Sequence, residues 1–162
     1  MASAKTDLPE KQTLVEQSAF LLARLGRVAS RRLNEELAAT GLKPPQAAIL
    51  FLLRDVGPQS QQSLGERVHV DPSNLVAFLN ALEDEGLLVR KRDPGDRRRH
   101  IVEITKQGIK RVPACNDPVY GLEDQLFAGL TAEEREQLHG LLARVLVTMS
   151  VEEPPPDGTD GH

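Results

Sequence analysis

The side chains best suited to chemistry are basic, and they gather between residues 90 and 111. This segment contains nine Lys or Arg and three Asp or Glu, a net charge of +6, whereas the 162-residue chain as a whole carries −4. Guanidinium and ammonium groups at this density can neutralise the phosphates of a nucleic acid backbone. Most charge runs are solvated surface, so charge alone leaves both interpretations open.

Cys115 is the single cysteine of the chain and a second candidate for chemistry. Lys110 and Arg111 lie nearby in the sequence and could lower the pKa of its thiol, as in an oxidant sensor. The alternative is an inert thiol packed in the interior. One cysteine forms neither an internal disulfide nor a thiolate metal site, which favours a reducing compartment, the cytoplasm.

Several function classes find no support in these residues. No glycine-rich phosphate loop, Gly-x-Ser-x-Gly elbow or His-Glu-x-x-His motif occurs, so we expect no enzyme. Aromatic residues make up only 3% of the chain, which disfavours a stacking platform for single strands. No apolar run is long enough to span a membrane. The four histidines are scattered, so neither a metal nor a cofactor is expected: His69, His100, His139 and His162.

Two helices are expected ahead of the basic segment. Apolar residues recur at helical spacing between 14 and 39, which predicts one long amphipathic helix that Thr40-Gly41 ends. Pro44-Pro45 can open a second helix, because proline at the first helical position loses no hydrogen bond. Its run 47–53, AAILFLL, is apolar on all sides and therefore central and buried, and Gly57-Pro58 ends it.

Two further helices follow after short turns. Ser60 can cap a short helix that reaches Arg67. Asp71-Pro72 marks the start of the next helix, with an acidic N-cap followed by proline, and Gly86 closes it. The apolar residues of this helix have the spacing of one buried face: Leu75, Phe78, Leu79 and Leu82.

The basic segment itself is mostly a predicted β-hairpin. The apolar period changes from 3.6 to about 2, so residues 87–92 and 100–104 are predicted as strands. Asp93-Pro94-Gly95-Asp96 between them is composed of turn residues. The basic side chains therefore lie on a hairpin with a charged tip.

Two C-terminal helices complete the predicted elements. Thr105 can cap the first of them, which we expect to be kinked or interrupted at Pro113 and Pro118. Residues 131–134, Thr-Ala-Glu-Glu, form a capping box that opens the last helix. The chain is thus mainly α, with about six helices and a small β-hairpin.

Three helices followed by a two-stranded hairpin are the order of a winged helix-turn-helix. A helix fits the major groove of duplex DNA, about 12 Å wide. An arginine-rich hairpin tip can reach the neighbouring minor groove, whose narrow channel attracts arginine. Helices alone could equally form any small helical core, and it is the basic hairpin in this position that favours DNA.

The stretch VHVDPSNLVAFLNALEDEGLLVRKRDPGDRRRHIVEITKQG, residues 68–108, resembles the MarR (multiple-antibiotic-resistance regulator) family of transcription factors. The best match is the wing, residues 93–98 (DPGDRR), followed by Val102, Ile104 and Thr105. The run LEDEGL at 82–87, with Val89 after it, also fits. With the long first helix and the last two helices, the resemblance extends over roughly residues 12–150.

The resemblance implies a homodimer with one winged domain in each subunit. Residues 12–43 and 105–150 would form the helical dimerisation region, and residues 44–104 the DNA-binding domain. Long apolar stripes on the first and last helices agree with this, because such faces need a partner. The proline-rich and acidic residues 151–162 and the first 11 residues are predicted to be disordered. Two-fold symmetry implies a pseudo-palindromic operator.

Two residues at the start of the fourth predicted helix, Ser73 and Asn74, are candidate base contacts. Asparagine can pair with adenine through two hydrogen bonds, whereas serine is tolerant of the base. The alternative for both is capping and solvent exposure. Gln61, beside the cap of the preceding helix, is a candidate phosphate or base contact.

The wing supplies the remaining candidates for DNA contact. Arg97 and Arg98 match the arginines that the family places in the minor groove, and Arg99 is expected to contact phosphate. Asp96 would hold an arginine by an ion pair rather than touch DNA. Arg90 is either a phosphate ligand or a surface residue of the strand.

This chain also departs from the family. One turn into the recognition helix it has Val76-Ala77 where many members have basic or hydroxyl residues, and no Lys or Arg occurs from Asp71 to Gly86. Base readout would then rest on few polar groups and on apolar contact with thymine methyls. The wing and the shape of the DNA would contribute more of the affinity.

The family also implies a repressor that a small aromatic or lipophilic ligand relieves. Phe20, Phe51 and Tyr120 are our candidates for the lining of its pocket. Two alternatives stay open. One is a winged-helix module that binds another protein, which the acidic end of the recognition helix favours. The other is a constitutive regulator without a ligand.

Overall fold

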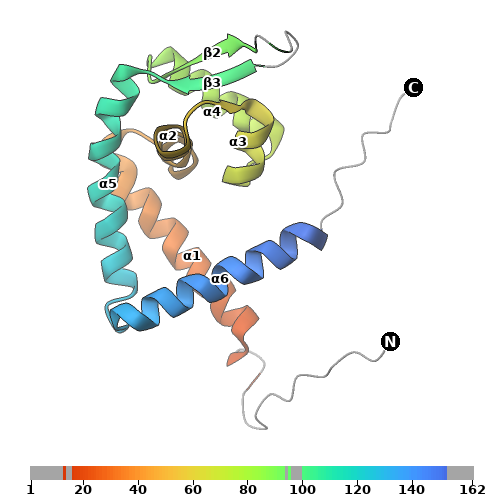
Figure 1. The fold of residues 1–162 in the computed structure, drawn as a ribbon. Coiled ribbons are helices and arrows are strands. Elements are labelled where there is room, and N and C mark those ends of the chain that lie inside the picture. Colours follow the sequence, from red (N-terminus) through yellow and green to blue (C-terminus); the bar gives the residue numbers. More distant parts are fainter. Residues whose placement is uncertain (1–12, 14–15, 94, 96–99, 153–162) are drawn as a thin grey trace. The chain divides into compact units, whose positions relative to one another are not determined.

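The computed structural model describes residues 13, 16–93, 95 and 100–152. Most of the predicted terminal tails, and five residues of the wing (94 and 96–99), lie outside these ranges. The chain divides into two compact units, residues 1–122 and 123–162. Figure 1 shows the order of the elements along the chain. Each unit is described by itself.

The first unit begins with the predicted long helix. Helix α1 spans Ser18–Leu37 and continues into a short 3-10 turn, η2 (Ala38–Thr40). Gly41 ends it in the left-handed conformation at φ 74°, as the sequence predicts. A guanidinium nitrogen of Arg111, far along the chain, donates to the Thr40 carbonyl at this end.

Helix α2 (Pro44–Val56) is the central helix of the unit. Lys43 precedes its two prolines, and the Lys43 backbone N–H donates to the Gln46 side chain at 2.9 Å. Ala47, Ile49, Leu50 and Leu53 are buried, whereas Phe51 and Leu52 are only partly so. The helix packs against α3, α4 and the sheet, which confirms its predicted central position.

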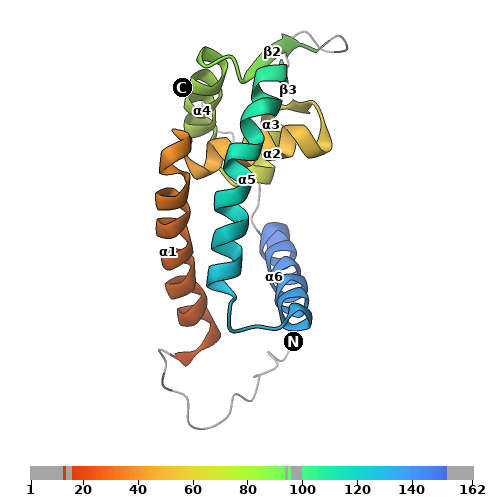
Figure 2. The same cartoon turned by 90° about the vertical axis from the view of Figure 1, so that its left-hand side faces the viewer.

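Helices α3 (Gln61–Val68) and α4 (Pro72–Asp84) follow as predicted from their caps. The Ser60 hydroxyl accepts from the Ser63 backbone N–H at 3.1 Å at the start of α3. At the other end of α4, Gly86 is left-handed at φ 69°. Figure 2 shows α2, α3 and α4 clustered on one side of the β2–β3 hairpin.

The sheet has one strand more than the sequence predicts. Strands β2 (Leu88–Arg92) and β3 (His100–Ile104) form the expected antiparallel hairpin, with Arg92 opposite His100. A two-residue strand β1 (Gln59–Ser60) pairs with the other edge of β3, so the order is β1-β3-β2. A strand of two residues is too short to show an alternation of apolar and polar side chains, so the sequence pattern does not predict β1.

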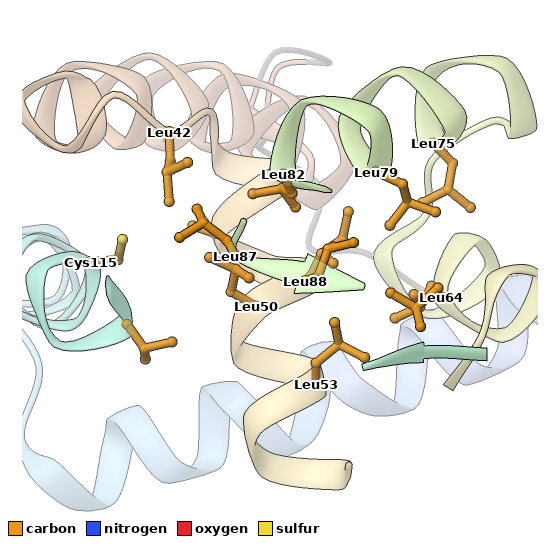
Figure 3. Packing of buried hydrophobic residues seen from close by; sticks show 14 of the residues in the cluster. Leu42, Leu50, Leu53, Leu64, Leu75, Leu79, Leu82, Leu87, Leu88 and Cys115 are labelled. Atoms are coloured by element: carbon orange, nitrogen blue, oxygen red, sulfur yellow. The ribbon is translucent and has the colours of Figure 1, made fainter. Parts of the chain in front are cut away.

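One core holds the helices and the sheet of this unit together. Figure 3 shows leucines from α2, α3, α4 and β2 converging on it. Its members come from every helix and strand between α1 and α5 except the short η2 and β1. They include Leu37, Leu42, Ile49, Leu50, Leu53, Leu64, Leu75, Leu79, Leu82, Leu88, Val102 and Val112.

Helix α5 (Lys106–Leu126) is one continuous helix through Pro113 and Pro118, so of the kink or interruption expected there, the interruption does not occur. Each proline removes one backbone hydrogen bond. Burial of Val112, Cys115 and Leu122 on the same helix supplies the packing that offsets this loss.

The start of α5 is tied to the hairpin. The Thr105 hydroxyl donates to the Gly86 carbonyl at 2.6 Å and accepts from the Gly108 backbone N–H at 3.0 Å, which confirms the predicted cap. A Cβ atom at Gly108 would lie 2.1 Å from the Leu87 carbonyl oxygen. Only glycine therefore fits where α5 crosses the first residues of the hairpin.

The second unit contains the end of α5 and helix α6 (Ala132–Glu152). The capping box is present: Thr131 N–H donates to the Glu134 carboxylate at 2.8 Å, and Glu134 N–H donates to the Thr131 hydroxyl at 3.3 Å. Arg135 ties the helix to the preceding turn through the Phe127 carbonyl and Asp124. Within the described residues, no helix is both long and apolar enough to cross a bilayer.

Candidate nucleic-acid interface

Helix α4 presents two different faces. Leu75, Leu79 and Leu82 are buried in the core and fix how the helix is rotated about its axis. The opposite side is open to solvent, with polar residues at both ends and apolar residues in the middle. Its exposed members are Pro72, Ser73, Asn74, Val76, Ala77, Asn80 and Asp84.

The N-terminal polar residues of α4 are organised by Asp71. Its carboxylate accepts from the Asn74 backbone N–H at 3.0 Å and from the Ser73 hydroxyl at 2.6 Å. The Asn74 side-chain amide donates to the same carboxylate. These hydrogen bonds, that of Ser73 first, lower the pKa of Asp71 to about 2. The carboxylate is therefore charged at neutral pH and holds both candidate base-contact residues.

The capping interpretation of Ser73 and Asn74 is thus realised in the structure. Asn74 can still contact a base, because its side-chain amide keeps a second N–H donor and an oxygen acceptor. Adenine offers the complementary acceptor and donor in the major groove. Gln61 is the first residue of α3 and is partly buried beside the cap Ser60. A helix N-terminus favours nearby negative charge, which suits a phosphate contact there.

Arg90 joins the hairpin to α4 rather than extending into solvent. Its Nε lies 2.9 Å from the Glu83 carboxylate, its backbone N–H donates to the same carboxylate at 3.0 Å, and its Nη2 donates to the Asn80 side chain at 2.7 Å. The hydrogen bond from Arg90 is the main cause that lowers the pKa of Glu83. We call this set, Asn80, Glu83 and Arg90, the α4–β2 link.

The α4–β2 link is the feature that sequence reasoning missed. From the sequence, Arg90 is predicted to be either a phosphate ligand or a surface residue of the strand. Asn80 and Glu83 carried no predicted role at all. Asn80 and Glu83 lie on α4 and Arg90 lies on β2, beyond the turn at Gly86. Neither a helical nor a strand period therefore connects the three residues.

The two strands of the wing hold its base in register. Lys91 on β2 forms an ion pair with Glu103 on β3. The Asp93 carboxylate accepts from the Gly95 backbone N–H at 2.8 Å, as an aspartate at the start of a turn commonly does. The predicted wing residues Asp96, Arg97, Arg98 and Arg99 lie outside the described residues. They connect Asp93 to His100, the first residue of β3.

The three aromatic residues predicted to line a ligand pocket are distributed over three helices. Phe51 on α2 lies under the Arg54 guanidinium, whose carbon is 5.5 Å from the ring centre. Phe20 on α1 is 54% exposed and Tyr120 on α5 is 65% exposed. Neither of these two side chains is enclosed within the single chain.

Cys115 is a buried residue of the core, 1% exposed. Burial is the main cause of a raised thiol pKa, and it outweighs a hydrogen bond with Thr40 and the positive charge of Arg111. The suggestion that neighbouring basic residues lower this pKa is therefore wrong in its net direction. The packed, inert thiol is the better description. In the described part of the chain, no three acidic, His or Cys side chains gather where they could hold a metal ion.

Known proteins are similar to this chain in both sequence and fold. A family model described as the MarR family matches residues 42–100. The chain is 32% identical over 129 residues to the HTH-type transcriptional regulator MhqR of Bacillus subtilis, covering 78% of this chain and 87% of that protein.

Two solved structures add a ligand and a nucleic acid to the comparison. CouR from Rhodococcus jostii, solved bound to p-coumaroyl-CoA, is 27% identical with a TM-score of 0.73, over 83% of this chain and 95% of that one. A mutant of MarR from E. coli, solved with operator DNA, is 27% identical with a TM-score of 0.72, over 83% of this chain and 99% of that one.

Proposed function

Since the chain belongs to the MarR family of DNA-binding transcriptional regulators, we propose that it acts as a homodimer on a pseudo-palindromic operator. The observation that carries this proposal is the α4–β2 link. It couples the solvent face of α4 to the base of an arginine-rich hairpin within one packed unit. A helix in the major groove and a hairpin in the adjacent minor groove then bind as one body.

The charge distribution supports this mode of binding. Residues 90–111 carry +6 in a chain of −4, so the attraction to phosphate is local to the hairpin and the helix after it. Arg97 and Arg98 enter the minor groove, Arg99 and Gln61 contact phosphate, and Asp96 orients an arginine of the tip. Acid elsewhere in the chain weakens non-specific binding, because it repels the duplex.

Exposed apolar side chains support the homodimer. Phe20, Leu21, Leu22 and Leu25 are exposed along α1. In the second unit, α6 exposes Leu141, Val145, Leu146 and Val147. Apolar rows of this kind are buried when two copies associate. The two recognition helices would then face half-sites about one DNA turn apart.

The regulation that we propose is repression relieved by a small aromatic or lipophilic ligand. CouR was solved with an aromatic thioester, p-coumaroyl-CoA, which supports this class of effector. Phe20, Phe51 and Tyr120 remain the proposed lining, completed by the partner subunit. A thermal-shift screen with phenolic compounds, scored by release of promoter DNA, separates such a sensor from a constitutive regulator. Action on the chromosome implies a cytoplasmic location.

The test of DNA binding is its dependence on salt and on the wing. We expect the full chain to bind duplex DNA from its own promoter region, with an affinity that falls steeply as salt rises. Replacing Arg97 and Arg98 together by Ala should weaken binding more than tenfold, because both lose their minor-groove contacts. Fluorescence anisotropy across a salt series measures both quantities.

A matched control removes the same charge elsewhere in the basic segment. Lys106 and Lys110 are exposed on α5, and their replacement by Ala should change affinity far less than the wing pair does. Equal losses would show that total charge, and not the wing, determines binding. No binding even at low salt would favour the alternative of a protein-interaction module, to which the acidic end of α4 is suited.

A further inference from the structure

We infer that Val76 and Ala77 recognise the C5-methyl groups of thymines, and so determine which bases α4 selects. This inference rests on the proposed function and names the chemistry by which that site reads its operator. It is based on the hydrogen bonds that the polar side chains of α4 make within the chain.

Three polar side chains on the solvent face of α4, those of Ser73, Asn74 and Asn80, already have partners within the chain. At the start of the helix, the Ser73 hydroxyl and the Asn74 amide both donate to Asp71. About two turns on, the Asn80 oxygen accepts from Arg90 at 2.7 Å. These groups are held at the two ends of the face and are not free to swing across it.

The middle of the face is apolar and open. Val76 is 38% exposed and Ala77 is also exposed, whereas Leu75 and Leu79 on either side of them are buried. Because those leucines fix the rotation of α4, Ala77 projects away from the core and Val76 lies on the side of the helix, partly open to solvent. Any base edge that meets the centre of the helix therefore meets carbon atoms.

The chemistry of the major groove identifies what such a surface can read. Guanine is recognised by Arg or Lys, and α4 contains neither. Thymine is the natural base that presents a methyl group there, and small apolar side chains contact it. Burying one methyl group corresponds to about a fourfold gain in affinity. Together with Asn74 on adenine, this selects A·T pairs under the first two turns of α4.

The experiment removes the methyl groups without changing base pairing. An operator is first selected from a pool of random duplexes with the full chain, and each thymine is then replaced in turn by deoxyuridine. We expect about a fourfold loss of affinity at one or two thymines in each half-site, and no loss at thymines outside the major-groove contact.

A pair of variants links the effect to its residue. Val76→Ser removes the two methyl groups at the centre of the face, and should weaken binding while making it insensitive to deoxyuridine at those thymines. Val56 is an exposed valine at the end of α2, so Val56→Ser is the matched control and should keep the full sensitivity.

The outcomes separate this inference from the function on which it rests. Failure to select any duplex would overturn the proposed function itself. Selection of an operator whose thymines all tolerate deoxyuridine would overturn the inference and leave DNA binding intact. Unchanged sensitivity in Val76→Ser would overturn the assignment to this residue, and circular dichroism confirms that the variant is folded.

Discussion

Asp71 is the residue on which the start of α4 depends. One exposed carboxylate satisfies the Asn74 backbone N–H and holds the side chains of Ser73 and Asn74. The Asp71 carboxylate therefore has two roles at the start of α4. It stabilises the first turn, and it sets the orientation of the two residues that we propose as base contacts.

The lowered pKa of Asp71 predicts a pH dependence of stability. The folded value is about 2, below the ordinary 3.8, so the carboxylate stabilises the fold above pH 3.8 and this contribution is lost as pH falls towards 2. We expect Asp71→Ala to lower the midpoint of thermal unfolding at pH 7. The difference from the wild type should shrink below about pH 4, which circular dichroism can follow.

Asp71→Asn is the matched control, because asparagine also caps helices but does not titrate. Its unfolding midpoint at pH 7 should lie above that of Asp71→Ala. A difference between the wild type and Asp71→Ala that stays constant from pH 7 to pH 3 would contradict the pKa assignment.

At the scale of elements, the α4–β2 link couples a helix to a hairpin. Arg90 donates to Glu83 through its backbone and its guanidinium, and reaches Asn80 as well. Lys91 and Glu103 then connect β2 to β3. The hairpin base therefore cannot shift against α4 without breaking a charged contact, which is what two simultaneous groove contacts require.

The direction in which Glu83→Ala changes operator affinity shows whether Arg90 links α4 to β2 or binds phosphate. If it is a link, Glu83→Ala loosens the hairpin and weakens operator binding several-fold, with a loss of about 1 kcal/mol or less in stability. If Arg90 is a phosphate ligand, the same change frees a cation, removes an acid and strengthens binding. We expect weaker binding, measured by anisotropy at fixed salt.

The matched control for Glu83→Ala is Asp84→Ala. Asp84 is the exposed next residue of α4, so this variant removes the same charge without touching Arg90. Binding should be unchanged or slightly stronger. Equal weakening by both variants would contradict the role of the link.

At the scale of the whole molecule, the proposed function depends on a second copy of the chain. Leu22 is one of the exposed apolar residues of α1, and a single chain leaves this row open to water. Leu22→Glu should shift the protein towards monomer in sedimentation and weaken operator binding at least tenfold, because the two half-sites are no longer bound together. The fold of each monomer should persist, because Leu22 is not in the core.

Ala23→Glu introduces the same charge about 100° round the helix from Leu22. We expect this control to remain dimeric and to bind DNA as the wild type does. If Leu22→Glu also remains dimeric at micromolar concentration, the α1 face is not the dimer interface.

The sequence by itself determined the local elements and the class of the protein. The ends of α1, α2, α3 and α4 are encoded by neighbouring residues, among them Gly41, Ser60, Asp71 and Gly86. Caps and left-handed glycines act over one helical turn, so they are visible in a short window. The wing motif, at a fixed spacing after the recognition helix, was sufficient to indicate the family.

Only the tertiary structure decided what depends on residues distant in the chain. Helix α5 continues through Pro113 and Pro118 because its buried side chains pack against the core of the first unit. No period in the sequence reveals that packing. Strand β1 exists because β3 is there to pair with it. Burial raises the pKa of Cys115 despite its basic neighbours, and Arg90 meets Glu83 across a turn. Such contacts join residues that no local signal connects, since packing and desolvation are properties of the assembled core.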